Sequence, residues 1–259
     1  MMQVVDCFLF ADELDMLECR LHELEEVVDW FVLVESEHTF QGNPKPLWYD
    51  THRERFARWS DRIVHVVAEL PDIDKPFDPQ YRRPSYERDP FIREAAQREA
   101  IIEGLKALPL TPDDTIVLSD VDEIWRPSIV VTDLPRPFTV LKQTMYVHNL
   151  GWQHPDLWDG PVVVHVEDLP PAEYGTFNIV RSCGQHPRPP RVPNAGWHLT
   201  YFGGPDAARN KLDSFSHTEC AEIDIADYAI RGLHVDGTEL IKTGRDADLP
   251  RWIPDRWLP

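Results

Sequence analysis

An apolar run that leads into acidic residues constrains the fold of this chain more than any other segment. Residues Ile116–Leu118 are apolar and mostly β-branched, and Asp120-Val121-Asp122-Glu123 follows after one serine. Runs of this kind are typical of a strand buried inside a sheet. Two residues spaced i, i+2 point to the same side of an extended chain. The sequence therefore predicts a buried strand with three carboxylates at its carboxyl end.

The paired acids indicate a chemistry and also have a plainer interpretation. Hard carboxylate oxygens suit Mg²⁺ or Mn²⁺, which can in turn hold the pyrophosphate of a substrate. Asp120 and Asp122 therefore predict a metal–diphosphate site, as in enzymes that use nucleotide-activated donors. The alternative is an acidic turn after a strand, and an isolated Asp-x-Asp does not decide between the two.

The composition fits one large α/β domain and disfavours two classes of partner. Of the 259 residues, 42% are hydrophobic and 10% aromatic, which is enough for a packed core. The net charge of −19 repels nucleic-acid phosphates and anionic membranes, and no Lys/Arg cluster offsets it. An anionic donor therefore needs help from a metal or from a few basic residues.

The chain shows no targeting or membrane-spanning signal, so we expect a cytoplasmic protein. Residues 1–6 lack a basic region followed by a long apolar stretch. No segment approaches the roughly 20 apolar residues of a membrane span. Cys7, Cys19, Cys183 and Cys220 form no Cys-x-x-Cys pair, and we expect buried free thiols.

The first half predicts the β-α-β start of an open, doubly wound sheet. Strands expected over residues 4–10 and 31–34 flank an amphipathic helix over 13–28, which Asp12 can cap. The next expected elements are a loop over 39–46, a helix over 51–59, a strand over 63–67, a proline-rich excursion or lid over 71–90 and a helix over 90–108. Ligands of such sheets bind beyond the carboxyl ends of the strands, where Glu35 and Asp120–Glu123 fall.

The second half is less regular. We expect strands over 138–146 and 162–166 in an antiparallel arrangement, then a proline-rich loop over 187–193. A strand over 197–202 and a helix over 206–216 follow, and the helix leads to His217. No repeat or linker divides the chain, so one mixed α/β domain over residues 1–259 is expected.

Several motifs together resemble glycosyltransferase family 17, and they follow that family's order from residue 6 to about residue 219. The earlier motifs are Asp6-x-Phe8, Glu13-Leu14-Asp15-x-Leu17-Glu18-x-Arg20-Leu21, Val34-Glu35-Ser36 and Thr39-Phe40-x-Gly42-x-Pro44-Lys45-Pro46-Leu47. The later motifs are Gln97-Arg98, Ser119-Asp120-Val121-Asp122-Glu123-Ile124, Gly196-Trp197-His198-Leu199-Thr200-Tyr201-Phe202-Gly203-Gly204 and Lys211-Leu212-x-Ser214-Phe215-Ser216-His217-Thr218-Glu219. There are two departures. The sequence shows no counterpart of the membrane anchor of vertebrate members, so we expect an unanchored protein, and Trp125 stands directly after Ile124, where many relatives have proline.

The resemblance implies an α/β fold of the GT-A type, an open mixed sheet that is largely parallel in its N-terminal half and flanked by helices. It also implies a metal-dependent inverting glycosyltransferase. Such an enzyme would move a sugar, with UDP-N-acetylglucosamine as the first donor to consider, to a glycan or another hydroxyl acceptor. Residues 1–125 would bind the nucleotide sugar and residues 126–259 the acceptor. A carbohydrate-binding protein or a catalytically degenerate relative of the same fold is the alternative.

The resemblance also suggests the metal ligands. Asp122 is expected to bind Mn²⁺ or Mg²⁺ directly and so to act in catalysis. Asp120 is expected to bind the ion through water or to hold the ribose hydroxyls. His217 is expected as the third ligand, because it follows a predicted helix in a His-x-Glu element and the resemblance places it near the donor. The other interpretation of His217 is a surface histidine. His198 is expected to be a core histidine with a satisfied hydrogen bond, and the other interpretation is a contact with the acceptor.

Three further residues are expected to contact the donor. Glu35 could accept a hydrogen bond from the uracil or the ribose, and Lys45 and Arg98 could bind phosphate. Each has a plainer interpretation, as a solvated strand-end acid, a solvated loop lysine and a helix-surface ion pair of Arg98 with Glu94.

Inversion requires a base that deprotonates the acceptor hydroxyl. The candidates are Glu219, Glu167, Asp168 and Glu123, and Glu219 is preferred because it lies in a matched motif. Two other enzyme classes are disfavoured: a phosphatase would carry its Asp-x-Asp after the first strand, and a nucleotidyltransferase would carry a glycine-rich loop there.

Overall fold

The computed structural model describes residues 2–71, 89–171, 176–183, 188–220, 222–243 and 249–258. Most of the excursion expected over residues 71–90 lies outside these ranges, and so does the first residue of the loop expected over 187–193. Among the described helices, none combines the length and the apolar character that a membrane crossing requires.

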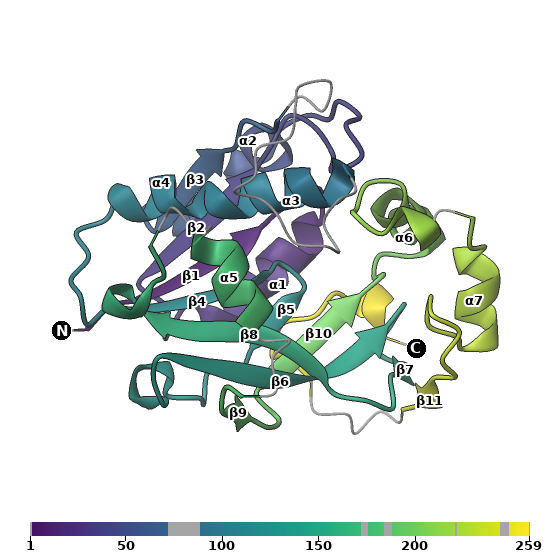
Figure 1. Cartoon of the computed structure of the whole chain (residues 1–259). Helices are drawn as coiled ribbons and strands as arrows, with labels where there is room; N and C mark the ends of the chain where they lie inside the picture. Colours follow the sequence, from purple (N-terminus) through teal and green to yellow (C-terminus); the bar gives the residue numbers. More distant parts are fainter. Residues whose placement is uncertain are drawn as a thin grey trace.

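One mixed sheet forms the centre of the described structure (Figure 1). Its main path runs β11-β7-β6-β8-β4-β1-β2-β3, and β5, β9 and β10 branch from it. The strands are β1 (Val4–Leu9), β2 (Trp30–Glu35), β3 (Ile63–Val67), β4 (Thr115–Asp120), β5 (Glu123–Trp125), β6 (Phe138–Val147), β7 (Trp152–Gln153), β8 (Trp158–His165), β9 (Arg191–Val192), β10 (Gly196–Thr200) and β11 (Ile241–Lys242).

The two halves of the sheet differ in strand direction, as the sequence predicts. β1 pairs in parallel with β2 and β4, and β2 pairs in parallel with β3. β8 is antiparallel to both β4 and β6. β10 lies between β5, to which it is antiparallel, and β6, to which it is parallel. The expected open mixed sheet with a parallel N-terminal half is confirmed.

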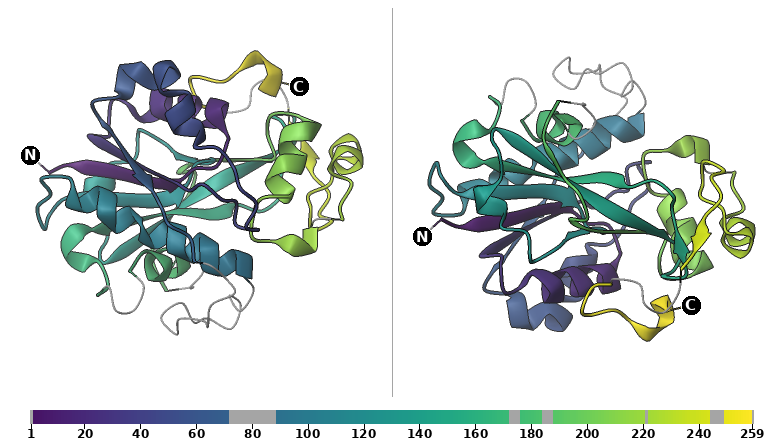
Figure 2. Two further views of the ribbon diagram at one scale, coloured as in Figure 1. Left: turned by 90° about the horizontal axis from the view of Figure 1, so that it is seen from above. Right: turned by 90° about the horizontal axis from the view of Figure 1, so that it is seen from below.

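Helices cover both faces of the sheet (Figure 2). The α-helices are α1 (Leu14–Leu24), α2 (Trp48–Thr51), α3 (Asp89–Glu99), α4 (Ile101–Lys106), α5 (Thr176–Cys183), α6 (Pro205–Leu212) and α7 (Ile225–Arg231). On one face, α1 packs through Leu17 and Leu21 against Phe8 of β1. On the other face, α4 and α5 pack through Leu105 and Phe177 in a second buried cluster. α6 and α7 form a third cluster beside β6 and β10.

The ends of several elements differ from the sequence prediction. α1 ends at Leu24 rather than residue 28, because the N–H groups of residues 27 and 28 both turn back to the Leu24 carbonyl. The helix expected over 90–108 is interrupted at Ala100 and ends at Lys106. The expected cap by Asp12 is wrong: Glu13 occupies the cap position of α1, without a side-chain capping bond. The buried free thiols expected at Cys7 and Cys19 are confirmed, whereas the free thiol of Cys220 is only partly buried.

Candidate functional site

A cavity of about 1060 Å³ opens at the carboxyl ends of β1 and β4. Its size is at the upper end for small-molecule sites, about 300–1,000 Å³. Both halves of the chain line it, mainly through residues 9–13, 38–40, 43–46, 120–123, 200–201, 210–211, 213–217 and 234–236. The cavity therefore lies where an open α/β sheet is expected to bind its ligand.

Asp120 ends β4 with its carboxylate between two guanidinium groups. Arg98 of α3 lies 3.3 Å from Oδ1, and Arg181 of α5 lies 3.0 Å from Oδ2. Burial raises the pKa of Asp120, but the two arginines outweigh it and hold the pKa below its usual value. Arg98 also makes the ion pair with Glu94, at 2.7 Å, that was its alternative interpretation.

Asp122 is almost fully buried and faces a lysine from the second half of the chain. The Lys211 Nζ lies 2.5 Å from its Oδ2, and the His198 Nε2 lies 3.4 Å from the same atom. Burial raises the pKa of Asp122, but Lys211 and His198 together bring it far below the usual value. Burial lowers the pKa of Lys211, and Asp122 more than reverses this. Both groups are therefore charged at neutral pH.

A glycine turn places Lys211 against Asp122. Gly203 and Gly204 have φ values of 98° and 91°, a region that glycine adopts without steric cost. Pro205 then occupies the first turn of α6, where its missing N–H costs no hydrogen bond. α6 runs from this turn to the cavity and carries Lys211 in its last turn.

Glu123 is buried and its carboxylate is already bonded. Its Oε1 accepts from Arg181 and, at 2.5 Å, from the Trp158 indole, and its Oε2 accepts from the Asp120 backbone N–H at 3.1 Å. A base needs a free oxygen within reach of the acceptor hydroxyl. In this structure the carboxylate of Glu123 holds the acidic turn through these bonds.

Arg20 of α1 also holds the acidic turn of residues 120–123, through its backbone carbonyls. Its guanidinium is fully buried and makes a two-pronged ion pair with Asp6, with both contacts at 2.7 Å. It also donates to the backbone carbonyls of Asp120, Val121 and Glu123, at 3.1, 3.3 and 2.9 Å. Arg20 thus fixes the backbone path on which the position of the two aspartates depends.

Glu35 and Lys45 are paired with each other beside the cavity. Glu35 is fully buried, accepts from the backbone N–H groups of Trp48 and Tyr49 at the start of α2, and lies 3.2 Å from His65 Nε2. The Lys45 Nζ lies 3.1 Å from Glu35 Oε1 and lines the cavity, whereas Glu35 does not line it. The carboxylate of Glu35 thus supports the loop that carries Lys45.

His217 and Glu219 line the cavity at its exposed edge. The His217 Nδ1 lies 2.8 Å from Glu219 Oε1, and both side chains are about half exposed. Within the described ranges, Asp120, Asp122 and His217 do not form a group whose ligand atoms all lie within 4.8 Å of one another. The structure thus brings the three expected metal ligands into one cavity without closing them around a single point.

The two other candidate bases lie elsewhere. Glu167 and Asp168 follow β8 and both pair with Arg136, at 2.7 and 2.5 Å. β8 ends at His165, which pairs with Thr115 at the start of β4. The two acids therefore follow the end of β8 that lies away from Asp120. Neither acid is among the lining residues of the cavity.

Several site residues were not singled out from the sequence. Arg20 and Lys211 lie in motifs of the family resemblance, so their type and position were visible but their partners were not. Arg181 lies in a segment with no motif. Its contacts with Asp120 and Glu123 join α5 to residues about 60 positions away, and no local pattern carries that information.

The arrangement suits a ligand that carries concentrated negative charge. Asp120 and Asp122 offer the hard oxygen donors that divalent cations such as Mg²⁺ and Mn²⁺ prefer. Arg98, Arg181 and Lys211 contact them with donors of the kind that bind phosphate oxygens, and Lys45 lines the same cavity. A diphosphate, with or without a divalent cation, matches this distribution of charge.

Comparison with known proteins gives a consistent result. The model of the family described as glycosyltransferase family 17 matches residues 1–228. The chain is 30% identical over 122 residues to the beta-1,4-mannosyl-glycoprotein 4-beta-N-acetylglucosaminyltransferases of Rattus norvegicus and Homo sapiens. The matched stretch is 47% of this chain but only 21% and 22% of those proteins, about a fifth of their length.

A weaker likeness is found among solved structures. A crystal structure of a galactosyltransferase in complex with donor and acceptor sugar analogues aligns with 63% of this chain and 58% of its own. The sequence identity is 11% and the TM-score 0.32.

Proposed function

The chain belongs to glycosyltransferase family 17, and on this basis we propose that it transfers a sugar from a nucleotide-sugar donor to a hydroxyl acceptor. One observation carries the proposal. The acidic turn at the end of β4 faces a large cavity in which Arg98, Arg181 and Lys211 surround its two aspartates. This combination can hold the diphosphate of a donor at the point where the sugar leaves.

Asp122, with Asp120, would hold a divalent cation of the Mg²⁺ or Mn²⁺ type. The donor set fits such an ion, because both carboxylates have lowered pKa values and stay anionic at neutral pH. When bound there, the cation would supply positive charge to the leaving diphosphate.

The basic residues would act on the diphosphate directly. Lys211 would exchange part of its contact with Asp122 for a phosphate oxygen, which a flexible ammonium group can do without moving its helix. Arg98 and Arg181 are held in place by Glu94, Glu123 and Asp120, and they present fixed donors to the same region. Negative charge on the leaving nucleotide would thus be met by groups that are already oriented.

The nucleoside would lie toward residues 10–13 and the loop that carries Lys45. These segments line the cavity at the carboxyl ends of β1 and β2. UDP-N-acetylglucosamine is the donor we propose first, because the named relatives are N-acetylglucosaminyltransferases. The acceptor, a glycan or another hydroxyl compound, would approach from the side formed by residues 126–259.

Glu219 is the base we propose for an inverting transfer. In such a reaction the acceptor oxygen attacks the anomeric carbon while a base takes its proton and the bond to the diphosphate breaks. Glu219 lines the cavity and lies 2.8 Å from His217, which can help to retain the proton. Of the other three candidates, Glu123 already accepts hydrogen bonds at both carboxylate oxygens, and Glu167 and Asp168 do not line the cavity.

The test measures binding of UDP, GDP, CMP and UDP-sugars, each with and without Mn²⁺. Thermal shift and calorimetry detect the binding. A ligand that binds only the folded state raises its apparent stability. We expect a shift with UDP that requires Mn²⁺ and is lost in Asp122→Ala. Asp213→Ala is the matched control, since it removes an exposed acid that also lines the cavity.

Three outcomes separate the interpretations. A UDP shift that survives Asp122→Ala would contradict the role of the acidic turn. The absence of any nucleotide shift would contradict the transferase proposal. UDP binding without transfer to any sugar acceptor would favour the degenerate relative.

A further inference from the structure

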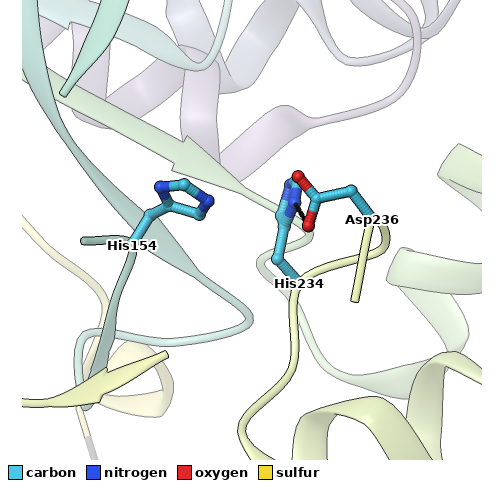
Figure 3. Close-up of side chains that lie close together, drawn as sticks. All are labelled: His154, His234 and Asp236. Atoms are coloured by element: carbon cyan, nitrogen blue, oxygen red, sulfur yellow. Dashed lines mark ion pairs between the residues drawn. The ribbon is translucent and has the colours of Figure 1, made fainter. Parts of the chain in front are cut away.

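Three potential metal ligands lie close together, and two of them line the cavity (Figure 3). One ring nitrogen from each of His154 and His234 and a carboxylate oxygen of Asp236 all lie within 4.8 Å of one another. The two imidazole rings meet edge to face, with centroids 5.2 Å apart, and the His234 Nδ1 lies 3.0 Å from Asp236 Oδ1. Among the described residues this is the one such group of three.

The fold brings these residues together from two separate segments. His154 follows β7, and His234 and Asp236 lie in the connection between α7 and β11. β11 pairs antiparallel with β7, which aligns that connection with His154. The connection is closed by its own hydrogen bonds, because the His234 N–H donates to the Thr238 carbonyl at 2.9 Å and the Thr238 N–H donates to Asp236 Oδ1 at 2.9 Å.

We propose that His154, His234 and Asp236 bind a divalent transition-metal ion of the Zn²⁺ type, at a site separate from Asp120 and Asp122. Two imidazoles and one carboxylate are a donor set that suits Zn²⁺ or Co²⁺ better than Mg²⁺, which prefers oxygen ligands. Three protein ligands also leave a coordination position open.

The distances require only a small adjustment. In tetrahedral coordination with metal–ligand bonds of about 2.0–2.2 Å, two ligand atoms lie about 3.3–3.6 Å apart. The present limit of 4.8 Å therefore asks the three side chains to close by at most about 1.5 Å. Asp236 is more than half exposed, so rotation of its side chain can provide this movement without disturbing the core.

The ring of His154 is already oriented by the backbone. Its Nδ1 lies 3.1 Å from the Asp156 N–H and 3.4 Å from the Asp156 carbonyl. Here Nδ1 accepts from the Asp156 N–H, so metal binding by Nε2 would move the ring proton to Nδ1 and exchange this bond for one from Nδ1 to the Asp156 carbonyl. A backbone carbonyl in this role is common behind histidine ligands. His154 is buried, so its ring has little freedom to turn away.

A metal ion bound at this site would be accessible from the cavity. His234 and Asp236 line the same cavity as Asp122, whereas His154 lies behind them. The open coordination position would therefore be available to water or to a hydroxyl group of a bound sugar. The plainer interpretation is an ion pair of His234 with Asp236 next to a hydrogen-bonded core histidine, and metal binding distinguishes the two.

The experiment is a titration of the full chain with Co²⁺, in which visible absorption and calorimetry detect binding. Zn²⁺ serves as the competitor. The variants are His154→Gln, His234→Gln and Asp236→Asn, and circular dichroism checks their folding. Asp122→Asn removes the proposed donor-side ligand, and His52→Gln, outside the cavity lining, controls for loss of one histidine. UDP binding is measured in parallel, so that failure of this site is distinguishable from failure of the proposed function.

We expect the chain to bind Co²⁺ at a site that Zn²⁺ displaces and that persists in Asp122→Asn and His52→Gln. Loss of His234 should weaken binding by at least about 100-fold, beyond the 10–100-fold typical of residues that only orient a ligand. If His154→Gln does not fold, Asp236→Asn provides the second variant, and we expect at least about tenfold weaker binding from it. Co²⁺ binding that is absent, that vanishes in Asp122→Asn, or that is unchanged in His234→Gln and Asp236→Asn would overturn the proposal.

Discussion

Replacing Arg20 with methionine is expected to destabilise the protein by about 3–5 kcal/mol, because it leaves a buried carboxylate without its counter-charge. Asp6 is fully buried, and both of its oxygens contact the Arg20 guanidinium at 2.7 Å. After the substitution, the Trp125 indole at 3.2 Å from Oδ1 remains as a donor. One neutral hydrogen bond contributes only about 0.5–1.5 kcal/mol and cannot replace the ion pair.

The same substitution removes the donors to three backbone carbonyls of the acidic turn. The turn should then lose its fixed path, so we expect weaker binding of UDP with Mn²⁺ even under conditions where the variant is folded. Arg20→Lys keeps the charge but has no planar guanidinium group that can contact both Asp6 and the turn. Its stability and its affinity for UDP should therefore lie between those of the unsubstituted protein and of Arg20→Met.

Urea unfolding measures the stability and calorimetry measures UDP binding. Adding Asp6→Asn to Arg20→Met removes the buried unpaired charge, so the double variant should be less destabilised than the sum of the single ones. Arg62→Met is the matched control, because Arg62 also donates to two backbone carbonyls, at 2.8 and 3.1 Å, at the end of α1 away from the cavity. A cost below about 1 kcal/mol for Arg20→Met, or equal UDP binding in Arg20→Met and Arg62→Met, would refute the reasoning.

Three further predictions concern other parts of the structure. In Gly196→Ala, the new Cβ would lie 2.2 Å from the Ile124 carbonyl oxygen, so β10 and β5 must separate, at a cost of about 1–3 kcal/mol in urea unfolding; no measurable loss would contradict the close packing of these strands. Burial raises the pKa of Asp114, but two backbone N–H groups, at 2.6 and 2.7 Å, lower it more. Its folded pKa is therefore below the unfolded value of about 3.9, so its contribution is present above that pH and is lost as the pH falls through the folded pKa; Asp114→Asn should flatten the acid side of the stability profile, and an unchanged profile would argue against this role. Lys211→Met should raise the pKa of Asp122 and weaken UDP binding by roughly 10-fold or more, as expected for one charge-assisted contact; unchanged affinity in calorimetry would remove Lys211 from the donor site.

Elements that depend on short stretches of sequence were predicted well. β4 was predicted because an apolar run stands next to acids, and the parallel β1-α1-β2 start was predicted because periods of two and of three to four residues alternate there. The endpoint of α1 was less accurate. Val28 continues the apolar spacing and is buried, but it reaches the core from a turn rather than from the helix.

The contacts that define the site could not be predicted in this way. Arg20 binds the carbonyl of Glu123, 103 residues later, and Arg181 binds Asp120 across 61 residues. These pairs depend on how α1 and α5 pack on opposite faces of the sheet, which no local pattern contains. Glu35 illustrates the same limit: its place at the end of β2 was predicted, but its use by the backbone of α2 depends on how the following loop folds back.

The position of β10 between β5 and β6 has a consequence for the order of events during synthesis. Lys211 follows Asp122 by 89 residues, which takes a ribosome about 4–18 s at about 5–20 residues per second. During that interval the first half can assemble its parallel strands while Asp122 lacks its lysine. The edges of β5 and β6 that will pair with β10 stay unpaired until residues 196–200 have been made. Unpaired edges are templates for pairing with other chains. The nascent protein therefore passes through a state that depends on dilution or on chaperones until the segment of residues 196–211 arrives.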